Sequence, residues 1–266
     1  MHEDVHAATT AHLSLLDRRL PGRAVGLYLT GGVALADYRP PHSDIDAVVV
    51  LDRPASDNDI DVLREVHAGL PATPAYDVTY LTREQLAAPP TEGLSAPFTL
   101  HGLFDDGLGG TTPATPVLWA ELARHALAVR EVPGLRVADD HAALRRHALE
   151  HLTTYWLPWL EDADRHLGAG RVGAAELEMA CTWPVFGVPR LHALLALDAI
   201  VSKSAAAAYA AATFPEHAAA AERALAHRHG EPQAFTGADA RAATALGRGV
   251  VADAAERWRQ VGSAAP

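Results

Sequence analysis

The sequence predicts a small α/β (α+β) domain with a mixed sheet, followed by an all-α helical-bundle domain, from three observations. In residues 1–81, short apolar runs alternate with helical segments, which is the pattern of an α/β unit. Residues 87–116 are rich in Pro, Gly, Thr and Asp, which is typical of a functional loop or an inter-domain connection. Beyond residue 115 the chain is rich in Ala and Leu and indicates helices throughout. We therefore expect domains over residues 1–112 and 113–266.

The elements of the first domain follow from apolar periodicity and from turn residues. Pro21 and Gly22 end the first helical pattern, and a turn rich in Pro, Ser, Asp and Asn spans residues 52–58. β-Branched and aromatic residues are enriched in the predicted strands, above all in the third. We expect helices over residues 4–19 and 59–68, strands over 25–30, 45–51 and 75–81, and a short strand near 98–103.

The second domain is expected to consist of helices. The alanine run at residues 205–208 is a strong helix former. Pro158 is expected to kink the helix in which it lies, because proline lacks the N–H of a helical hydrogen bond. The helices are expected over residues 116–130, 139–167, 171–182, 190–201, 202–213, 215–229 and 237–260.

Charge and composition narrow the classes of partner. The formal net charge of −11 argues against a nucleic-acid polymer, which is bound by an excess of Lys and Arg, and it suits a small cationic partner. The single cysteine, Cys181, excludes an internal disulfide and fits a reducing compartment. The acidic N-terminus lacks a secretory signal, and no apolar run is long enough to span a bilayer. We expect a cytoplasmic monomer with no membrane partner.

One stretch of the first domain carries the chemistry. Residues two apart in a strand share a face, so Asp44 and Asp46 are expected to project together, about 6–7 Å apart along the strand. Two such carboxylates can bind Mg²⁺, which prefers oxygen ligands. Gly31 and Gly32 leave backbone N–H groups accessible at the start of a short helix, where phosphate is favoured. The combination predicts chemistry on a nucleoside triphosphate.

The same stretch resembles the nucleotidyltransferase signature of the polymerase-β superfamily. That signature is a glycine followed by Gly or Ser, a short helix, and then Asp-x-Asp on a strand, matched here by Gly31-Gly32 and by Ser43-Asp44-Ile45-Asp46. The resemblance implies that Asp44 and Asp46 bind two Mg²⁺ ions and that Gly31, Gly32 and Ser43 hold the β- and γ-phosphates of ATP. Many relatives have a serine at the position of Gly32.

Asp77 lies early on the third predicted strand, which is expected to neighbour the second. In the superfamily a third acidic residue on such a strand completes the metal site or acts as the general base, and the resemblance gives Asp77 this role. A base must reach the attacking hydroxyl directly or through one water. Relatives usually have Glu at this position, so Asp77 has a shorter reach. The alternative is an exposed Asp at the start of a strand.

The second half resembles the helical domain of streptomycin/spectinomycin adenylyltransferases. Arg190 is followed thirteen residues later by Lys203, and an Ala-rich helix then ends before Pro215. The resemblance implies that Arg190 and Lys203 bind the phosphates of ATP and close over the nucleotide. Arg and Lys are both suited to phosphate, Arg through a planar fork and Lys as a point charge.

The resemblance also implies where the acceptor binds. Glu176, with Glu178 beside it, falls near a position where relatives meet the amines of the antibiotic. His101 and Phe104 are candidates for an aromatic platform at the acceptor site. Solvated helix carboxylates remain the alternative for the two glutamates.

A second motif indicates a different chemistry. His147-Ala148-Leu149-Glu150-His151 matches the H-x-x-E-H pattern of inverted zinc peptidases, and on a helix its two histidines share a face. The chain has fifteen histidines, so that a match by chance is the favoured interpretation.

With the resemblance, the sequence predicts a Mg²⁺-dependent O-nucleotidyltransferase. It would transfer AMP from ATP to a hydroxyl of an aminoglycoside or aminocyclitol antibiotic and release pyrophosphate, which would confer antibiotic resistance. Two alternatives stay open: a nucleotidyltransferase that acts on a protein or on another small molecule, and a non-catalytic nucleotide-binding module.

Overall fold

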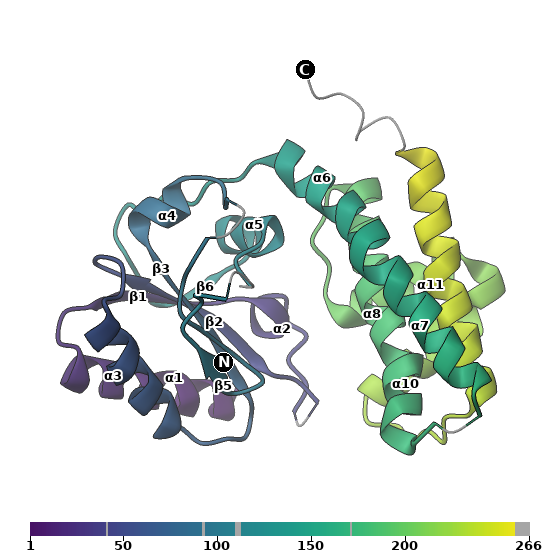
Figure 1. The fold of residues 1–266 in the computed structure, drawn as a ribbon, viewed down its shortest axis with the longest axis horizontal. Helices are drawn as coiled ribbons and strands as arrows, with labels where there is room; N and C mark the ends of the chain where they lie inside the picture. Colours follow the sequence, from purple (N-terminus) through teal and green to yellow (C-terminus); the bar gives the residue numbers. More distant parts are fainter. Residues whose placement is uncertain (41, 92–93, 110–112, 171, 259–266) are drawn as a thin grey trace. The chain divides into compact units, whose positions relative to one another are not determined.

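The structure is a computed structural model that describes residues 1–258 except 41, 92–93, 110–112 and 171 (Figure 1). The chain divides into two compact units, Met1–Asp140 and His141–Pro266. The first unit is built on a sheet and the second on helices, which confirms the predicted fold class. The division comes later in the chain than the expected one between residues 112 and 113.

In the first unit, six strands of the described residues form one mixed sheet in the order β5-β4-β3-β2-β1-β6. The central pair β2 and β3 is parallel, and each of the other neighbouring pairs is antiparallel. The strands are β1 (Ala24–Leu29), β2 (Ile45–Leu51), β3 (Tyr76–Thr82), β4 (Phe98–Leu100), β5 (Leu103–Asp105) and β6 (Leu127–Arg130).

The edge strand β6 explains the later boundary. It pairs with β1 through Tyr28 and Ala128, and the helix before it, α5 (Pro116–Arg124), buries Trp119 in the core of the first unit. The composition of residues 116–130 predicts a helix of the second domain. That interpretation is wrong for residues 127–130, because pairing with a distant strand prevails over the local helical composition.

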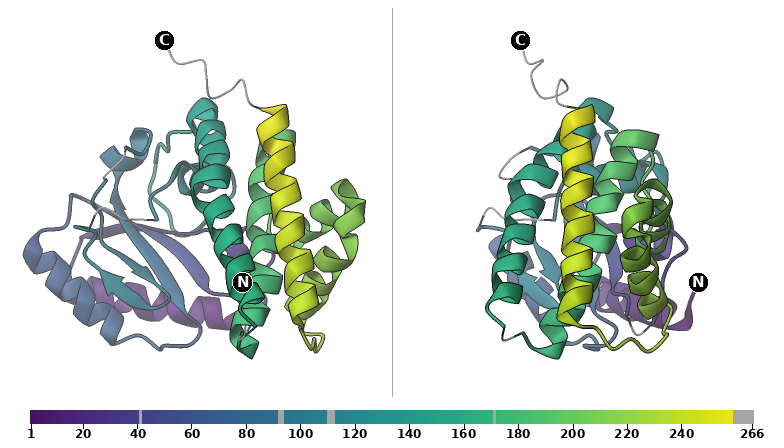
Figure 2. Two further views of the ribbon diagram at one scale, coloured as in Figure 1. Left: turned by 45° about the vertical axis from the view of Figure 1, so that its right-hand side comes forward. Right: turned by 90° about the vertical axis from the view of Figure 1, so that its right-hand side faces the viewer.

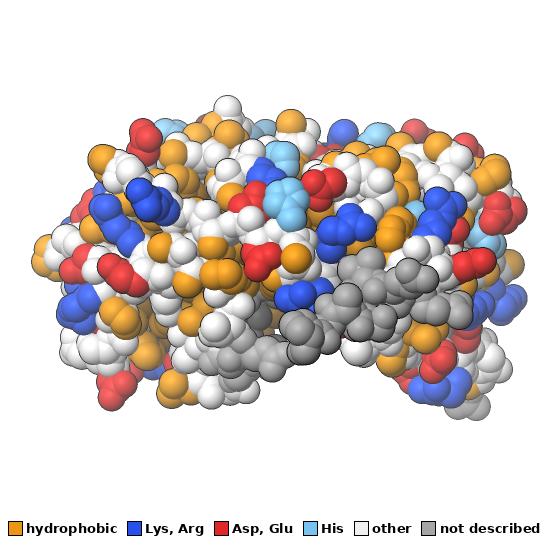
Figure 3. Space-filling view, turned by 90° about the horizontal axis from the view of Figure 1, so that it is seen from above, with side chains coloured by type: hydrophobic (Ala, Val, Ile, Leu, Met, Phe, Trp, Pro, Cys, Tyr) orange, Lys and Arg blue, Asp and Glu red, His pale blue; other side chains and the backbone are white. Residues whose placement is uncertain are grey.

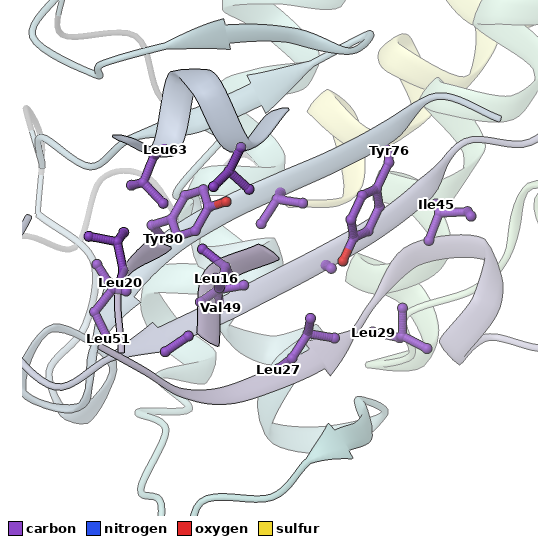
Figure 4. Packing of buried hydrophobic residues seen from close by; sticks show 14 of the residues in the cluster. Leu16, Leu20, Leu27, Leu29, Ile45, Val49, Leu51, Leu63, Tyr76 and Tyr80 are labelled. Atoms are coloured by element: carbon purple, nitrogen blue, oxygen red, sulfur yellow. The ribbon is translucent and has the colours of Figure 1, made fainter. Parts of the chain in front are cut away.

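Helices cover both faces of the sheet (Figure 1). Alternate residues of β2 point to opposite faces, so that Val49 packs with α1 and α3 while Val48 packs with α4 and α5. Figure 4 shows Tyr76 and Tyr80 of β3 pointing into the first of these two cores. These helices are α1 (Glu3–Arg19), α3 (Asp57–Ala68), α4 (Arg83–Ala87) and α5. The short helix α2 (Gly31–Ala34) comes between β1 and β2 in the chain.

The second unit contains only helices among its described residues, as predicted. The long helix α11 runs beside α7 and α8 (Figure 2). The elements are α6 (His141–His151), a π-helical turn η1 (Leu152–Trp156), α7 (Leu157–Gly168), α8 (Ala174–Leu197), α9 (Lys203–Thr213), a 3₁₀ turn η2 (Pro215–His217), α10 (Ala218–Arg228) and α11 (Gly237–Arg257).

Prolines act differently in two of these helices. Before Pro158 the helix widens into the π turn η1, which accommodates the proline without ending the helix. In contrast, α8 runs without interruption through Pro184 and Pro189, where the sequence analysis expected two separate helices. That expectation is wrong because both prolines are buried, and packing against neighbouring helices offsets the lost N–H groups.

A close contact in this bundle allows a test. Gly187 of α8 lies directly against the indole of Trp156, and a Cβ added there would overlap the ring. We expect Gly187→Ala to lower the free energy of unfolding by about 1–3 kcal/mol, the usual cost of overpacking. Gly249→Ala in α11 is the matched control, because its nearest contact, with His217, is an ordinary 3.5 Å. The control should gain stability in urea unfolding, since Ala favours a helix over Gly. Equal stability of the two variants would contradict the close packing of Gly187 on Trp156.

Two histidines lie close together between α1, α3 and β3, and the second of them, His67, is partly buried. His12 is fully buried, with Nδ1 3.1 Å from the Tyr76 hydroxyl and Nε2 2.8 Å from the Tyr80 hydroxyl. The Tyr80 hydroxyl also lies 2.6 Å from Nε2 of His67. Burial lowers the pKa of His67 from 6.5 to about 4, and burial followed by repulsion from His67 lowers the pKa of His12 well below its usual value.

These shifts make acid destabilise the fold. Both histidines have a lower pKa folded than unfolded, so the unfolded chain binds more protons below pH 6.5. We expect the histidine contribution to the free energy of unfolding to be constant above about pH 7.5 and to fall between about pH 6.5 and 4, by up to about 1.4 kcal/mol per pH unit for His67, with His12 acting in the same direction. His67→Gln should reduce that slope in denaturant titrations. An identical slope in the variant would contradict this assignment.

In the part of the chain that the structure describes, no helix has the length and apolar character needed to cross a membrane. On the face drawn in Figure 3, basic side chains are interspersed with acidic ones.

Candidate active site

Three carboxylates of the first unit gather at one end of the parallel strand pair. Asp46 of β2 and Asp77 of β3 are direct neighbours in the parallel register. Asp44 precedes Asp46 by two residues and therefore shares its side of the sheet, as expected from the alternation of a strand. Asp77 is buried, and the other two are partly buried. The structure thus places the three predicted acidic residues together.

A tight turn adds a histidine to this group. Strands β4 and β5 are joined by His101 and Gly102, whose φ angles of 52° and 74° are both positive, as in a two-residue hairpin turn. One ligand atom each from Asp44, Asp77 and His101 lies within 4.8 Å of the others, an arrangement that could hold a metal ion. The N–H of Gly102 donates to Oδ1 of Asp77 at 3.1 Å, which fixes the carboxylate against the turn.

The surroundings of Asp77 raise the pKa of its carboxyl group. Burial is the main cause, and the nearby negative charge of Asp44 adds to it. The backbone N–H groups of His101 and Gly102 act in the opposite direction, because they stabilise the carboxylate. Bringing Asp44 and Asp77 together therefore has an electrostatic cost, which a bound cation would relieve.

The glycine turn after β1 packs against the second carboxylate of the pair. Gly31 has a φ of +54°, and a Cβ added there would overlap the carboxylate of Asp46. Both observations require glycine at this position. Gly32 is different, since a Cβ there would come no closer than 3.5 Å to the backbone of Asp37.

Glu121 of α5 is a site residue that the sequence analysis missed. Its side chain is buried, and Oε2 accepts a hydrogen bond from the N–H of Gly31 at 3.3 Å. The N–H predicted to hold phosphate is therefore in contact with a carboxylate in this structure. In the sequence, Glu121 is an acidic residue between Trp119 and Leu122 on an apolar helix. That pattern predicts an exposed side chain, so it did not indicate a role in the site.

Ser43 directly precedes Asp44, and its side chain forms a hydrogen bond with the backbone. It is buried, and its hydroxyl accepts a hydrogen bond from the N–H of Arg39 at 3.0 Å. The side chain of Arg39 pairs with buried Asp37 at 2.9 Å. These contacts hold Asp37, Arg39 and Ser43 in place, and Ser43 directly precedes Asp44.

In the second unit the two predicted phosphate-binding residues, Arg190 and Lys203, lie at the same turn. Nε of Arg190 donates to the carbonyl of Val201 at 3.1 Å, so that its guanidinium lies beside the turn that leads into α9. Lys203 is the first residue of α9, and Ser202 caps that helix through the N–H of Ala205. Lys203 is also the single lysine of the sequence, against twenty-one arginines.

The predicted acceptor residues have different local contacts within their own units. Glu176 caps the start of α8, where its carboxylate accepts from the N–H of Gly173 at 2.8 Å. Glu178 lies 3.2 Å from His227 and is 54% exposed. Phe104 packs against the core of α1 and α3 and stacks near His67, on the face of the sheet opposite to Asp77. His101, the other candidate of the first unit, lies beside the carboxylates.

The H-x-x-E-H motif lies on α6 as predicted. The rings of His147 and His151 stack with centroids 5.6 Å apart, and Tyr155 continues the stack at 4.7 Å. Among the described residues, no further His, Cys, Asp or Glu side chain joins this pair to form a group with metal-binding spacing. The motif therefore forms an aromatic stack.

Together, the mixed sheet, the glycine turn against an Asp-x-Asp strand and the helical second unit define a nucleotidyltransferase-like fold. The structure is similar to that of the spectinomycin adenyltransferase AAD(9) from Enterococcus faecialis, solved with ATP and spectinomycin. The TM-score is 0.62 at 14% sequence identity, over 92% of this chain and 98% of that one. The chain therefore has an aminoglycoside adenylyltransferase-like fold. No protein-family model matches the sequence, and no curated protein does.

Proposed function

We propose that this protein is a Mg²⁺-dependent O-nucleotidyltransferase that transfers AMP from ATP to a hydroxyl of an aminoglycoside or aminocyclitol antibiotic and thereby confers resistance. The observation that carries the proposal is the gathering of Asp44, Asp46 and Asp77 beside the Gly31 turn. The similarity to a structure that holds ATP and spectinomycin supports the choice of nucleotide and acceptor. We propose that the protein acts in the cytoplasm as a monomer.

The donor set fits a divalent cation. Asp44, Asp46 and Asp77 offer carboxylate oxygens, the ligands that Mg²⁺ prefers, and two of them stand close enough to repel each other. These three residues would hold two ions. When bound, the cations would neutralise triphosphate charge and stabilise the charge that develops at the α-phosphorus.

The residues around the metal ligands would orient the reactants. The oxygen of the acceptor hydroxyl attacks the α-phosphorus, the bond to the β-phosphate oxygen breaks, and pyrophosphate leaves. Asp77, whose pKa is raised by burial, would accept the proton of the hydroxyl. Gly31 and Gly32 would hold the β- and γ-phosphates through their N–H groups, aided by Ser43. At Gly31 the phosphate would replace Glu121 as the acceptor.

The acceptor would be bound by carboxylates that attract its ammonium groups. Glu178 is the stronger candidate because its side chain, although 3.2 Å from His227, is 54% exposed, while the carboxylate of Glu176 is engaged in capping α8. His101 would contact the acceptor or the metal ion held by the carboxylates. Phe104 would support the hairpin from the other face of the sheet.

Arg190 and Lys203 would bind the phosphates of ATP, and the single lysine offers a direct test. Lys203 provides the one lysine ε-amine in the chain, so an amine-reactive reagent modifies either this residue or the N-terminus. We expect Mg²⁺ and ATP to slow acylation of Lys203 by about tenfold or more, as read by peptide mass, without changing acylation of the N-terminus. Equal rates with and without ATP would contradict the assignment of Lys203.

The function itself is tested by pyrophosphate release from ATP and Mg²⁺ in the presence of spectinomycin, streptomycin and other aminoglycosides, with product masses recorded. A drug that gains one adenylyl unit supports the proposal and identifies the acceptor. ATP binding without transfer to any drug would overturn the antibiotic as acceptor. A purified protein that becomes adenylylated instead would reassign the acceptor to a protein hydroxyl.

A further inference from the structure

We propose that His101 is a ligand of the divalent cation held by Asp44 and Asp77, and that the site consequently prefers a first-row transition-metal ion, with Mn²⁺ as the representative, over Mg²⁺. This inference deepens the proposed function, because it concerns the metal preference of the same site. The proposal rests on the position of the imidazole, on the conformation of its turn and on the chemistry of the donor set.

The position of the imidazole is the first argument. A ring nitrogen of His101 and one oxygen each of Asp44 and Asp77 lie within 4.8 Å of one another. Ligands on opposite sides of an ion with bonds of about 2.1 Å are separated by about 4 Å, so a small closure of this group would satisfy one ion. Asp46 packs against Gly31 instead and is not part of this three-residue group.

The conformation of the turn is the second argument. His101 has a φ of 52°, a left-handed conformation that is unfavourable for a non-glycine residue. Asn or Gly is the usual choice at this position of a two-residue hairpin. The exposed imidazole is not held there by burial in the core. A ligand role for the ring gives this strained position a function.

The turn also connects the histidine to the carboxylates. Gly102, the second residue of the turn, donates its N–H to Asp77 at 3.1 Å. The hairpin formed by β4 and β5 pairs next to β3, the strand that carries Asp77. The same two-residue turn therefore holds one ligand through its backbone and supplies another through its side chain.

The chemistry of the donor set decides the metal. Mg²⁺ is a hard cation that binds oxygen ligands and retains several waters. Imidazole nitrogen is a softer donor that favours first-row transition metals, while carboxylates suit Mn²⁺ as well as Mg²⁺. Two carboxylates with one imidazole should therefore bind Mn²⁺ more tightly than Mg²⁺, and the imidazole should be the origin of the difference.

The test measures Mn²⁺ binding to the intact protein without ATP or acceptor. Free Mn²⁺ is followed by electron paramagnetic resonance, and nitrogen ligation is detected by pulsed methods that record coupling to ¹⁴N. His101→Asn is the informative variant, since Asn tolerates positive φ and should keep the turn. His166→Asn, an exposed histidine on α7, is the matched control.

We expect wild-type protein and the control to show ¹⁴N coupling, and His101→Asn to lose it. The Kd for Mn²⁺ should rise about tenfold or more in His101→Asn, while the Kd for Mg²⁺, measured by competition, changes by less than about twofold. Absence of ¹⁴N coupling in the wild type, an unchanged Kd for Mn²⁺, or equal losses for Mn²⁺ and Mg²⁺ would overturn the proposal. The Mn²⁺-binding measurement uses no nucleotide, so its result does not depend on whether the transfer assay succeeds.

Discussion

Asp44→Asn is expected to reduce nucleotidyl transfer by about a thousandfold, which corresponds to about 4 kcal/mol of transition-state stabilisation. The amide has the shape of the carboxylate but lacks its negative charge, so it binds a divalent cation poorly. The fold should not suffer, because Asp44 contributes to the repulsion that raises the pKa of Asp77. We therefore expect an unchanged or higher melting temperature together with the loss of activity.

The matched control is Asp61→Asn on the exposed side of α3, where the carboxylate forms a surface pair with Arg64. This variant should retain wild-type transfer and wild-type stability, since surface ion pairs contribute little. Transfer within about twofold of wild type in Asp44→Asn would remove Asp44 from the metal site. A large fall in its melting temperature would instead show that the carboxylate stabilises the fold.

Gly31→Ala is expected to have the second large effect, and it should affect both stability and catalysis. The φ of +54° costs alanine about 1 kcal/mol, and the new methyl group would displace the carboxylate of Asp46. We expect the free energy of unfolding to fall by about 2 kcal/mol or more and transfer to fall at least a hundredfold.

Gly32→Ala serves as the stability control for this variant. It lies one residue away in the same turn, but its added Cβ would meet the Asp37 backbone at an ordinary 3.5 Å. Its melting temperature should stay close to that of the wild type. If thermal unfolding gave Gly31→Ala and Gly32→Ala the same melting temperature, the close contact between Gly31 and Asp46 would be refuted.

The central arrangement of carboxylates could be predicted from the sequence because it depends on local rules. A strand has a period of two, which places Asp44 and Asp46 on one side, and a helical crossover makes the following strand a parallel neighbour. Asp77 then comes into register with Asp46. The fold class followed from the same alternation of apolar runs and helical segments.

Features that depend on contacts distant in the sequence could not be predicted in this way. Glu121 reaches the N–H of Gly31 across ninety residues of sequence, and nothing near it in the chain indicates that partner. The closeness of His101 to Asp44 requires the β4–β5 hairpin to pair beside β3. Strand β6 pairs with β1 although its own sequence reads as helix.

In α8 the local signals were misleading. Pro184 and Pro189 indicated a break between two helices, since each lacks an N–H and crowds the preceding turn. The structure keeps one helix because its sides are buried against other helices of the second unit. Glu176 and Glu178, the predicted acceptor ligands, also have partners that the sequence does not indicate, a helix cap and His227. Such competing partners are visible only in three dimensions.

The most direct test of the central claim is to follow ATP labelled at the α- or the γ-phosphate in parallel reactions with the acceptor drug. Attack at the α-phosphorus places the α-label on the drug and the γ-label in pyrophosphate, and both signals should disappear in Asp44→Asn. Transfer of the γ-label to the drug would mean phosphoryl transfer. That result would contradict the assignment of Asp44, Asp46 and Asp77 to adenylyl transfer.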